Sequence, residues 1–219
     1  MNVGIYSFCT SDLNPNIALY QNKVFNKFNL KINQYIEEPT DDLHQQHGRV
    51  INKIIEQSKE DYIIIFDIDC IPLKYDFYKK ICEQISDNRT LSGARGSSGN
   101  GMRDYIHAGF FGFSKILYTE CGSPSMDYFN SEYSGDTIQR FTDECIKLNK
   151  NIIYWEITNA LDNVFYIPSK NEHFGHGTIY ENLIYHQFQI SCPLKFINSD
   201  KHIENQNTFI KKCEEVLLS

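Results

Sequence analysis

Two aspartates separated by one residue, Asp67 and Asp69, follow an apolar stretch of the chain. Residues 62–66 read YIIIF and lead into the pair without a polar break. Residues i and i+2 of an extended segment point the same way, so the two carboxylates face the same space. Like charges held together need a cation, and a hard divalent ion takes oxygen ligands of this kind. The pair therefore predicts a site for Mn²⁺ or Mg²⁺, against the alternative of two solvated aspartates at a turn.

The apolar stretch has the pattern of a central strand that is buried on both faces of a sheet. Strands and helices alternate along the chain, which is typical of an α/β architecture. Ligands of mostly parallel sheets bind outside the carboxyl ends of the strands, where the two aspartates emerge. We expect strands at residues 3–9, 30–36, 62–66, 90–94, 107–113, 151–157 and 163–167, and helices at 15–28, 50–58, 77–85, 138–148 and 209–217.

Composition indicates a globular protein and excludes some classes of partner. The chain has 219 residues, of which 41% are hydrophobic, enough to bury one sizeable core. A formal charge of -7 argues against nucleic acid as a partner, because a nucleic-acid binder needs a basic face. We find neither a signal-peptide pattern nor an apolar run of about 18 residues, so we expect no integral membrane segment and a cytoplasmic location.

The cysteines do not predict a disulfide framework or a zinc site. They are odd in number, widely scattered and without a CxxC pair. We expect them to be reduced and mostly buried. The seven positions are Cys9, Cys70, Cys82, Cys121, Cys145, Cys192 and Cys213.

The segment IIIFDIDCIPL, residues 63–73, resembles the DxD motif of glycosyltransferases with the GT-A fold. The resemblance implies a single-domain, Rossmann-related α/β fold with a mixed, mostly parallel central sheet flanked by helices. It also implies metal-dependent transfer of a sugar from a nucleoside-diphosphate sugar, a UDP- or GDP-sugar, to a glycan or other hydroxyl acceptor. We expect one domain over residues 1–219, with a nucleotide-sugar half at about 1–105, an acceptor and metal half at 106–190, and a C-terminal segment with a helix at 191–219.

Two later segments are similar to parts of the same family. HAGFFGFSK, residues 107–115, resembles the strand that brings a small residue, here Ala108 or Gly109, against the donor sugar. SGDTIQRF places Asp136 near the start of a helix, where related enzymes carry a carboxylate that acts as general base or binds sugar hydroxyls. The alternative is a capping box, because Gln139 follows three residues later.

A histidine late in the chain completes the metal shell in many GT-A enzymes. The segment NEHFGHGTIY, residues 171–180, is similar in placement, and we read it as a loop that contains glycine. Neutral imidazole is a suitable ligand for Mn²⁺ beside carboxylate and phosphate oxygens. The resemblance implies His176 as the metal ligand, with His173 as a possible further ligand and His186 as another candidate, against the alternative of solvated histidines.

Contacts with the nucleotide sugar are expected from position alone. The carboxyl end of the first strand opens on the same crevice as the aspartate pair. Arg95 and Arg103 flank the stretch GSSGNG, which predicts a mobile lid or an ordinary flexible segment. The residues expected to contact the nucleotide sugar are Tyr6, Ser7, Thr10, Arg49, Asn52, Asp67, Ile68, Arg95, Ala108 and Gly109.

Three other functions share parts of this pattern. Haloacid-dehalogenase-type phosphatases also place two aspartates after an apolar strand, but they want Thr or Val where this chain has Ile71, and a later aspartate where it has Arg140. A nucleotidyltransferase would carry a basic, glycine-rich N-terminal loop, which residues 6–15 lack. A non-catalytic sugar-nucleotide-binding module has less need of a metal pair, so we favour an enzyme.

Overall fold

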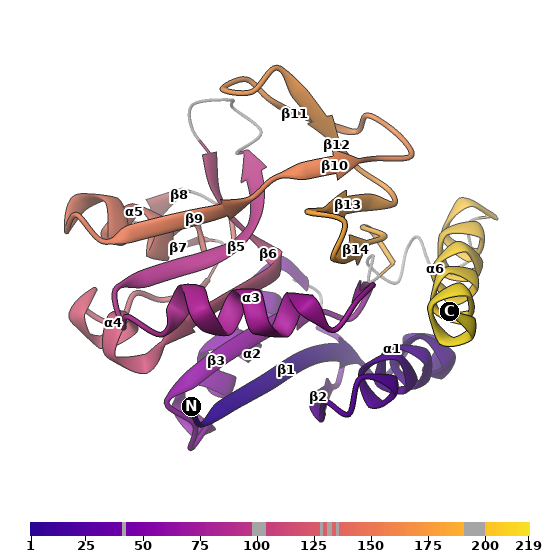
Figure 1. Cartoon of the computed structure of the whole chain (residues 1–219), viewed down its shortest axis with the longest axis horizontal. Coiled ribbons are helices and arrows are strands. Elements are labelled where there is room, and N and C mark those ends of the chain that lie inside the picture. Colours follow the sequence, from indigo (N-terminus) through magenta and orange to yellow (C-terminus); the bar gives the residue numbers. More distant parts are fainter. Residues whose placement is uncertain (41–42, 98–103, 128, 131–132, 135, 191–199) are drawn as a thin grey trace.

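The computed structural model describes residues 1–40, 43–97, 104–127, 129–130, 133–134, 136–190 and 200–219. Gly96 and Ser97, the first two residues of the expected lid, end a strand, and the rest of that segment with Arg103 lies outside the described residues. The main sheet contains β1 (Val3–Thr10), β2 (Ile32–Glu37), β3 (Tyr62–Asp67), β5 (Thr90–Ser97), β6 (Asp104–Ser114) and β9 (Asn151–Trp155). Its order is β2-β1-β3-β6-β5-β9, and β6 alone runs antiparallel to its neighbours (Figure 1). The sheet is therefore mixed and mostly parallel, as expected.

Helices flank this sheet. Asn14 accepts a hydrogen bond from the backbone N–H of Asn16 at 3.1 Å, so the first helix begins at Pro15 as predicted. The fourth and shortest helix was not expected, and the last begins earlier than expected. No helix of the described residues is long and apolar enough to cross a membrane. The helices are α1 (Pro15–Lys27), α2 (Leu43–Gln57), α3 (Asp76–Ile85), α4 (Lys115–Glu120), α5 (Gln139–Lys147) and α6 (Asp200–Leu218).

The strand β3 is buried on both faces. Ile63 and Ile65 pack into the core on the side of α2, α4 and α5, whereas Ile64 and Phe66 pack on the side of α1 and α3. All four side chains are buried, which explains the lack of alternation in the sequence. Among the described residues the six cysteines are free, and all but Cys82 are buried.

A second, smaller sheet lies beside the main one (Figure 1). It contains β10 (Ile157–Asn159), β13 (Thr178–Tyr180), β14 (Ile184–His186) and β4 (Cys70–Pro72), in that order. A hairpin of β11 (Phe165–Ile167) and β12 (Glu172–Phe174) and a short pair of β7 (Phe129–Asn130) and β8 (Tyr133–Ser134) complete the strands of the described residues. The segment 171–180, interpreted as a loop from the sequence, therefore contains β12 and β13. Three-residue strands are too short to show an alternating pattern.

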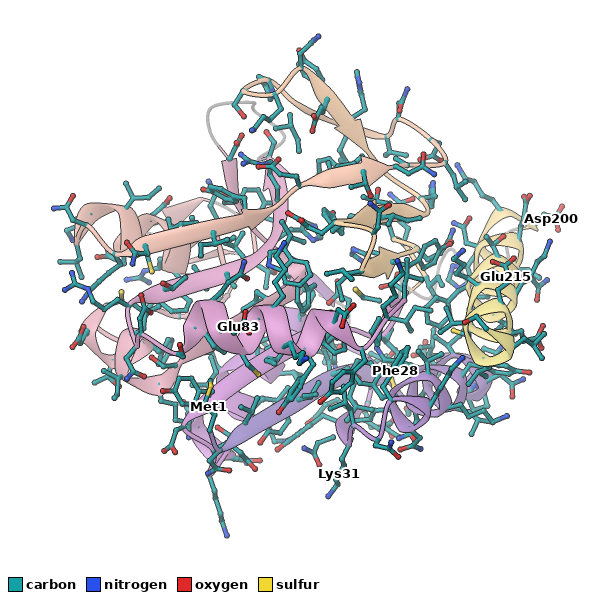
Figure 2. All side chains as sticks on the ribbon, in the orientation of Figure 1. Met1, Phe28, Lys31, Glu83, Asp200 and Glu215 are labelled. Atoms are coloured by element: carbon teal, nitrogen blue, oxygen red, sulfur yellow. The ribbon has the colours of Figure 1, made fainter. Side chains whose placement is uncertain are left out.

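The C-terminal helix α6 lies beside α1 (Figure 1). Side chains fill the space between the two helices, while Asp200 and Glu215 mark the outer part of α6 (Figure 2). Phe209 and Val216 of α6 pack with Ile17 of α1 in the same buried cluster. The segment 200–219 thus covers the side of the sheet next to the turn that follows β3.

Candidate metal centre

Asp67, Asp69 and His186 form the one group of three or more metal-ligating side chains found in the described part of the chain. Their ligand atoms lie within 4.8 Å of one another. His186 Nε2 is 3.1 Å from Asp69 Oδ1 and 3.7 Å from Asp67 Oδ2. Asp69 is 2% exposed and His186 1% exposed. Two carboxylates and one imidazole form a donor set that suits a divalent transition metal such as Mn²⁺.

His186 reaches the aspartates through the second sheet. The strand β14 pairs antiparallel with β4, and this register sets His186 opposite Cys70, next to Asp69. The backbone after His186 then holds Asp69 from the other side. The N–H of Gln187 donates to the Asp69 carbonyl at 2.9 Å, and the N–H of Ile190 donates to Asp69 Oδ2 at 3.2 Å. Asp69 is thereby fixed at both its backbone and its side chain.

Gly109 of β6 makes room for His186. A Cβ at Gly109 would lie well inside van der Waals distance of the His186 ring atoms Cε1 and Nδ1. The ring also stacks on Phe188, with centroids 3.7 Å apart. The sequence predicted a close approach at Gly109, and the structure shows one, with an imidazole. The expected contact between Gly109 and a sugar stays a prediction.

His47 of α2 is a site residue that the sequence analysis missed. Its Nε2 lies 2.9 Å from Asp67 Oδ1. Burial disfavours the imidazolium, but the charges of Asp67, Asp136 and Asp69 outweigh burial and raise the pKa of His47 above its ordinary value. In return, the histidines hold the pKa of Asp67 well below its usual range despite its burial.

The helical spacing could have revealed His47. It lies four and eight residues before Ile51 and Ile55, on the apolar stripe of α2. His47 also lies in the first half of α2. That half is the one nearest to the carboxyl edge of the sheet, because a helix between two parallel strands starts at the edge where the first strand ends. A histidine on a buried stripe at that end of a helix faces the site.

Gln21 of α1 holds the turn that carries the aspartates. Its side-chain N–H groups donate to the carbonyls of Asp67 at 2.7 Å and Cys70 at 2.9 Å. Its Oε1 accepts from the Ser7 hydroxyl at 2.8 Å and from Gln34 at 3.0 Å. Gln21 and Ser7 are fully buried. Ser7, expected to contact the nucleotide, is therefore buried and holds Gln21, which in turn holds the aspartate turn.

A second histidine, His107, faces the same group of charges. Its Nδ1 accepts a hydrogen bond from the N–H of Gly109 at 2.9 Å, which places the proton of the neutral ring on Nε2. Burial lowers the pKa of His107 to about 4, against the opposing charges of Asp136 and Asp67, so the ring is neutral at neutral pH. Its centroid lies 5.7 Å from that of His186.

Asp136 lies close enough to act electrostatically on both His47 and His107. Its carboxylate accepts hydrogen bonds from the Tyr105 hydroxyl and, at 2.8 Å, from the N–H of Thr137. Half of the expected capping box is present, because Gln139 Oε1 accepts from the N–H of Asp136 at 3.0 Å. The helix itself begins at Gln139. Asp136 is thus held beside the candidate site, and its expected role as a base or sugar ligand stays a prediction.

The histidines predicted as metal ligands lie elsewhere. His176 Nδ1 is 2.5 Å from Asp162 Oδ2, and its Nε2 is 3.1 Å from Gln189 Oε1. His173 lies exposed on β12, where its ring contacts that of Tyr166. Neither belongs to the group with Asp67 and Asp69. Of the three histidines named from the sequence, the structure brings His186, the further candidate, to the aspartates.

Two expected nucleotide contacts are engaged within the protein. The Tyr6 hydroxyl donates to Glu60, near the amino end of β3, which points it away from the carboxyl edge. Arg95 is buried and forms ion pairs with Asp104 and, at 2.6 Å, with Glu156. Both side chains would have to exchange these partners in order to bind a nucleotide sugar.

The remaining expected contacts differ in exposure. The Asn52 side chain accepts a backbone hydrogen bond at 3.0 Å from the loop after α4. Ile68 and Ala108 are buried in the core, Thr10 is half-buried, and Arg49 is exposed. Their contacts with a nucleotide sugar stay predictions.

Comparisons with known proteins find similar solved structures but no matching sequence family. No protein-family model and no curated protein sequence matches the chain. A Drosophila β1,4-galactosyltransferase 7, solved with manganese, UDP-Gal and xylobiose, is 12% identical with a TM-score of 0.49, over 70% of this chain and 65% of that one. A glycosyltransferase involved in glycosylation of the major capsid of PBCV-1 is 17% identical with a TM-score of 0.39, over 55% and 63% of the two chains. The bifunctional IspDF of Campylobacter jejuni is 10% identical with a TM-score of 0.43, over 71% and 50%.

Glycosyltransferases are thus among the similar solved structures. In each of these three pairs the match spans less than two thirds of the known chain. The identities do not exceed 17% and the TM-scores do not reach 0.5, so no residue role is transferred from these proteins.

Proposed function

We propose that the protein is a metal-dependent glycosyltransferase that moves a sugar from a nucleoside-diphosphate sugar to a hydroxyl acceptor. The observation that carries the proposal is the group of Asp67, Asp69 and His186 at the carboxyl edge of the main sheet. That edge is where open α/β sheets bind ligands. Two carboxylates held together also repel each other, and a bound divalent cation would offset that repulsion.

In this proposal Asp69 and His186 hold the metal, and Asp67 ligates it or supports the nucleotide ribose. The bound metal stabilises the negative charge that develops on the leaving nucleoside diphosphate. Gln21 keeps the turn between β3 and β4 in place, and the backbone of Ile190 keeps the Asp69 carboxylate in one orientation. Ligands held in this way lose little freedom when the donor binds.

The acceptor side of the reaction falls to Asp136 and His107. Asp136 removes the proton of the acceptor hydroxyl or binds sugar hydroxyls. Neutral His107 has its Nδ1 occupied by the N–H of Gly109, so its Nε2–H is available as a donor to a sugar oxygen. We propose Mn²⁺ rather than Mg²⁺ as the metal, because imidazole is a better ligand for Mn²⁺ than for the harder Mg²⁺.

A thermal-shift panel of UDP- and GDP-sugars, each with and without Mn²⁺, tests the proposal. A ligand that binds only the folded state raises the melting temperature. At least one nucleotide sugar should therefore raise it when Mn²⁺ is present and not when Mn²⁺ is absent. The same donor should release nucleoside diphosphate slowly with water and faster with an acceptor.

A phosphate-monoester assay run beside this panel separates the closest alternative. A phosphatase would use Asp67 as a nucleophile and turn over simple monoesters. Monoester hydrolysis that disappears in Asp67→Asn, without diphosphate release from any donor, would overturn the proposal.

A further inference from the structure

Large apolar side chains are exposed in the segment that enters the β11–β12 hairpin. Leu161 is 67% exposed, Val164 45% and Phe165 36%. Single exposed apolar residues are common on protein surfaces, but a contiguous group marks a binding surface. We call Leu161, Val164 and Phe165 the apolar platform.

The platform is continuous with the candidate metal centre through a row of rings. Phe165 stacks on Phe174 with centroids 5.0 Å apart, and it lies 6.0 Å from Phe188. Phe188 in turn stacks on His186 at 3.7 Å. Each contact lies in the range of aromatic pairs that pack specifically, except the closer pair with the histidine. The exposed ring of Phe165 is therefore two ring contacts away from a proposed metal ligand.

The rest of the platform lies along the segment 174–177. A Cβ at Gly177 would overlap the Leu161 side chain, and a Cβ at Gly175 would lie 3.0 Å from Val164 Cγ2. Gly177 also has a φ of +66°, which favours glycine. The two glycines that flank His176 thus let the platform residues lie flat against this segment.

His176 fastens the platform to the segment that carries His186. Its N–H donates to Asp162 Oδ1 at 2.8 Å, and its carbonyl accepts from the N–H of Leu161 at 3.0 Å. The ring pairs with the Asp162 carboxylate on one side and reaches Gln189 at 3.1 Å on the other. His176 is therefore a positioning residue that ties the loop at 161–164 to the segment after β14.

We propose that the apolar platform binds the acceptor and that the acceptor is a saccharide. The inference rests on the proposed glycosyl transfer, which needs a hydroxyl acceptor beside the metal-bound donor. A saccharide ring has an apolar C–H face that packs on an aromatic ring and hydroxyls that bond to the polar groups around it. The platform offers this combination, because the side chain of Asp162, in the loop between Leu161 and Val164, is 41% exposed and can accept from hydroxyls beside its bonds with His176.

Charge argues against an anionic membrane as the occupant. Such a surface attracts clusters of Lys and Arg. Asp162 lies between Leu161 and Val164 in the chain, and Glu172 lies opposite Ile167 in the β11–β12 hairpin. Lys170, between the two strands of this hairpin, is paired with Glu156 at 3.5 Å. The formal charge of the chain is -7. A neutral, hydroxyl-rich ligand fits this environment better than an anionic one.

The test is binding of methyl glycosides and disaccharides to the full chain, by ligand-observed NMR without metal and by isothermal titration with Mn²⁺ present. At least one saccharide should bind. Phe165→Leu keeps apolar packing on Phe174 but removes the ring. It should lower the affinity for that saccharide about three- to tenfold, which corresponds to the loss of one aromatic contact. Tyr166→Leu is the matched control, because Tyr166 points to the opposite face of the same strand. It should bind the saccharide as the wild type does.

Each result has a distinct meaning. Absence of saccharide binding, or equal losses in Phe165→Leu and Tyr166→Leu, would overturn the saccharide platform, and so would vesicle binding that Phe165→Leu abolishes. The donor readout separates the two proposals, because metal-dependent nucleotide-sugar binding should be the same in Phe165→Leu and wild type. A wild type that binds saccharides but no nucleotide sugar would refute the glycosyl transfer and leave the platform as a saccharide site.

Discussion

The main sheet and the second sheet supply different parts of the candidate metal centre, and they hold them by different means. Asp67 ends β3, a six-residue strand buried on both faces and paired along its length with β1 and β6. His186 ends β14, a strand of three residues. Phe188 and Gln189 follow it with φ values of +62° and +60°, in the left-handed region. Asp67 thus stands on regular structure, whereas Asp69 lies in the turn that follows and is held by the backbone after β14. The imidazole depends on a short pairing and on side-chain contacts.

This contrast predicts which substitutions the site tolerates. Substitutions at the end of β3 should weaken metal binding because they remove ligand atoms, with little change in the structure of the sheet. Substitutions around β14 should weaken metal binding because they displace His186, since few backbone hydrogen bonds hold that strand. The four predictions below compare the two sheets by the loss of metal-dependent donor binding, from the largest to the smallest.

Asp69→Asn should have the largest effect. It removes a proposed ligand charge, and we expect metal-dependent nucleotide-sugar binding to fall by at least about a hundredfold. Asparagine keeps an acceptor for the N–H of Ile190, whereas alanine would leave that buried group unpaired. The fold should therefore persist in Asp69→Asn, which circular dichroism checks. Titration with Mn²⁺ and the nucleotide sugar measures the loss of binding.

The matched control is Asp61→Asn, an exposed aspartate before the other end of β3. It changes the net charge by the same amount at a place remote from the site. Donor binding at wild-type strength in Asp69→Asn would contradict the assignment of this carboxylate. Similar losses in both variants would show that only the overall charge matters.

His186→Gln and His176→Gln form the second test. Both histidines are buried and each contacts an aspartate. We expect His186→Gln to weaken Mn²⁺ binding about 10- to 100-fold. His176→Gln should leave Mn²⁺ affinity near that of the wild type and instead lower the free energy of unfolding by about 1–3 kcal/mol, because Asp162 and Gln189 lose their partner.

The opposite result would restore the sequence-based expectation for His176. If Mn²⁺ binding in the presence of donor fell in His176→Gln and not in His186→Gln, the chain would have to rearrange around the donor. The comparison between the two sheets would then hold only for the ligand-free state.

Gly109→Ala should have the third largest effect. Its Cβ overlaps the His186 ring, which also stacks on Phe188, so the imidazole has to move. We expect roughly a tenfold loss of Mn²⁺ affinity, at the lower end of the cost of disturbing a ligand. Gly112→Ala is the control in the same strand, because its Cβ meets the flexible end of Ile81 at 3.0 Å. Equal affinity in the two variants would show that His186 is not a ligand.

Sequence reasoning predicted the main sheet well and the second sheet poorly, for a physical reason. The end of β3 is a local pattern, because burial on both faces and the two aspartates lie within eight consecutive residues. The placement of His186 depends on a three-residue pairing with β4, more than a hundred residues earlier in the chain. No periodicity marks such a strand. His176 was favoured because its segment is similar in placement to the histidine that completes the metal shell of GT-A enzymes, and placement along the chain does not show which side chains meet in space. In the structure the glycines beside His176 make room for Leu161 and Val164.

The contact between Gln21 and the aspartate turn was equally hidden from the sequence, and it gives the last and smallest effect on metal binding. Gln21 accepts from Ser7 and donates to the carbonyls of Asp67 and Cys70, all in a buried setting. Gln21→Ala leaves these groups unpaired and should lower the free energy of unfolding by about 2–4 kcal/mol. Mn²⁺ affinity should fall only about two- to fivefold, because Asp69 keeps its bonds to the segment after β14.

Lys23→Ala is the control, since Lys23 is exposed two residues further along α1. Urea unfolding and Mn²⁺ titration of both variants separate stability from affinity. If Gln21→Ala weakened Mn²⁺ as much as Asp69→Asn does, the turn would depend on α1 more than on either sheet. The regular pairing of β3 would then not be enough to fix Asp67, and the contrast between the two sheets would be wrong for β3.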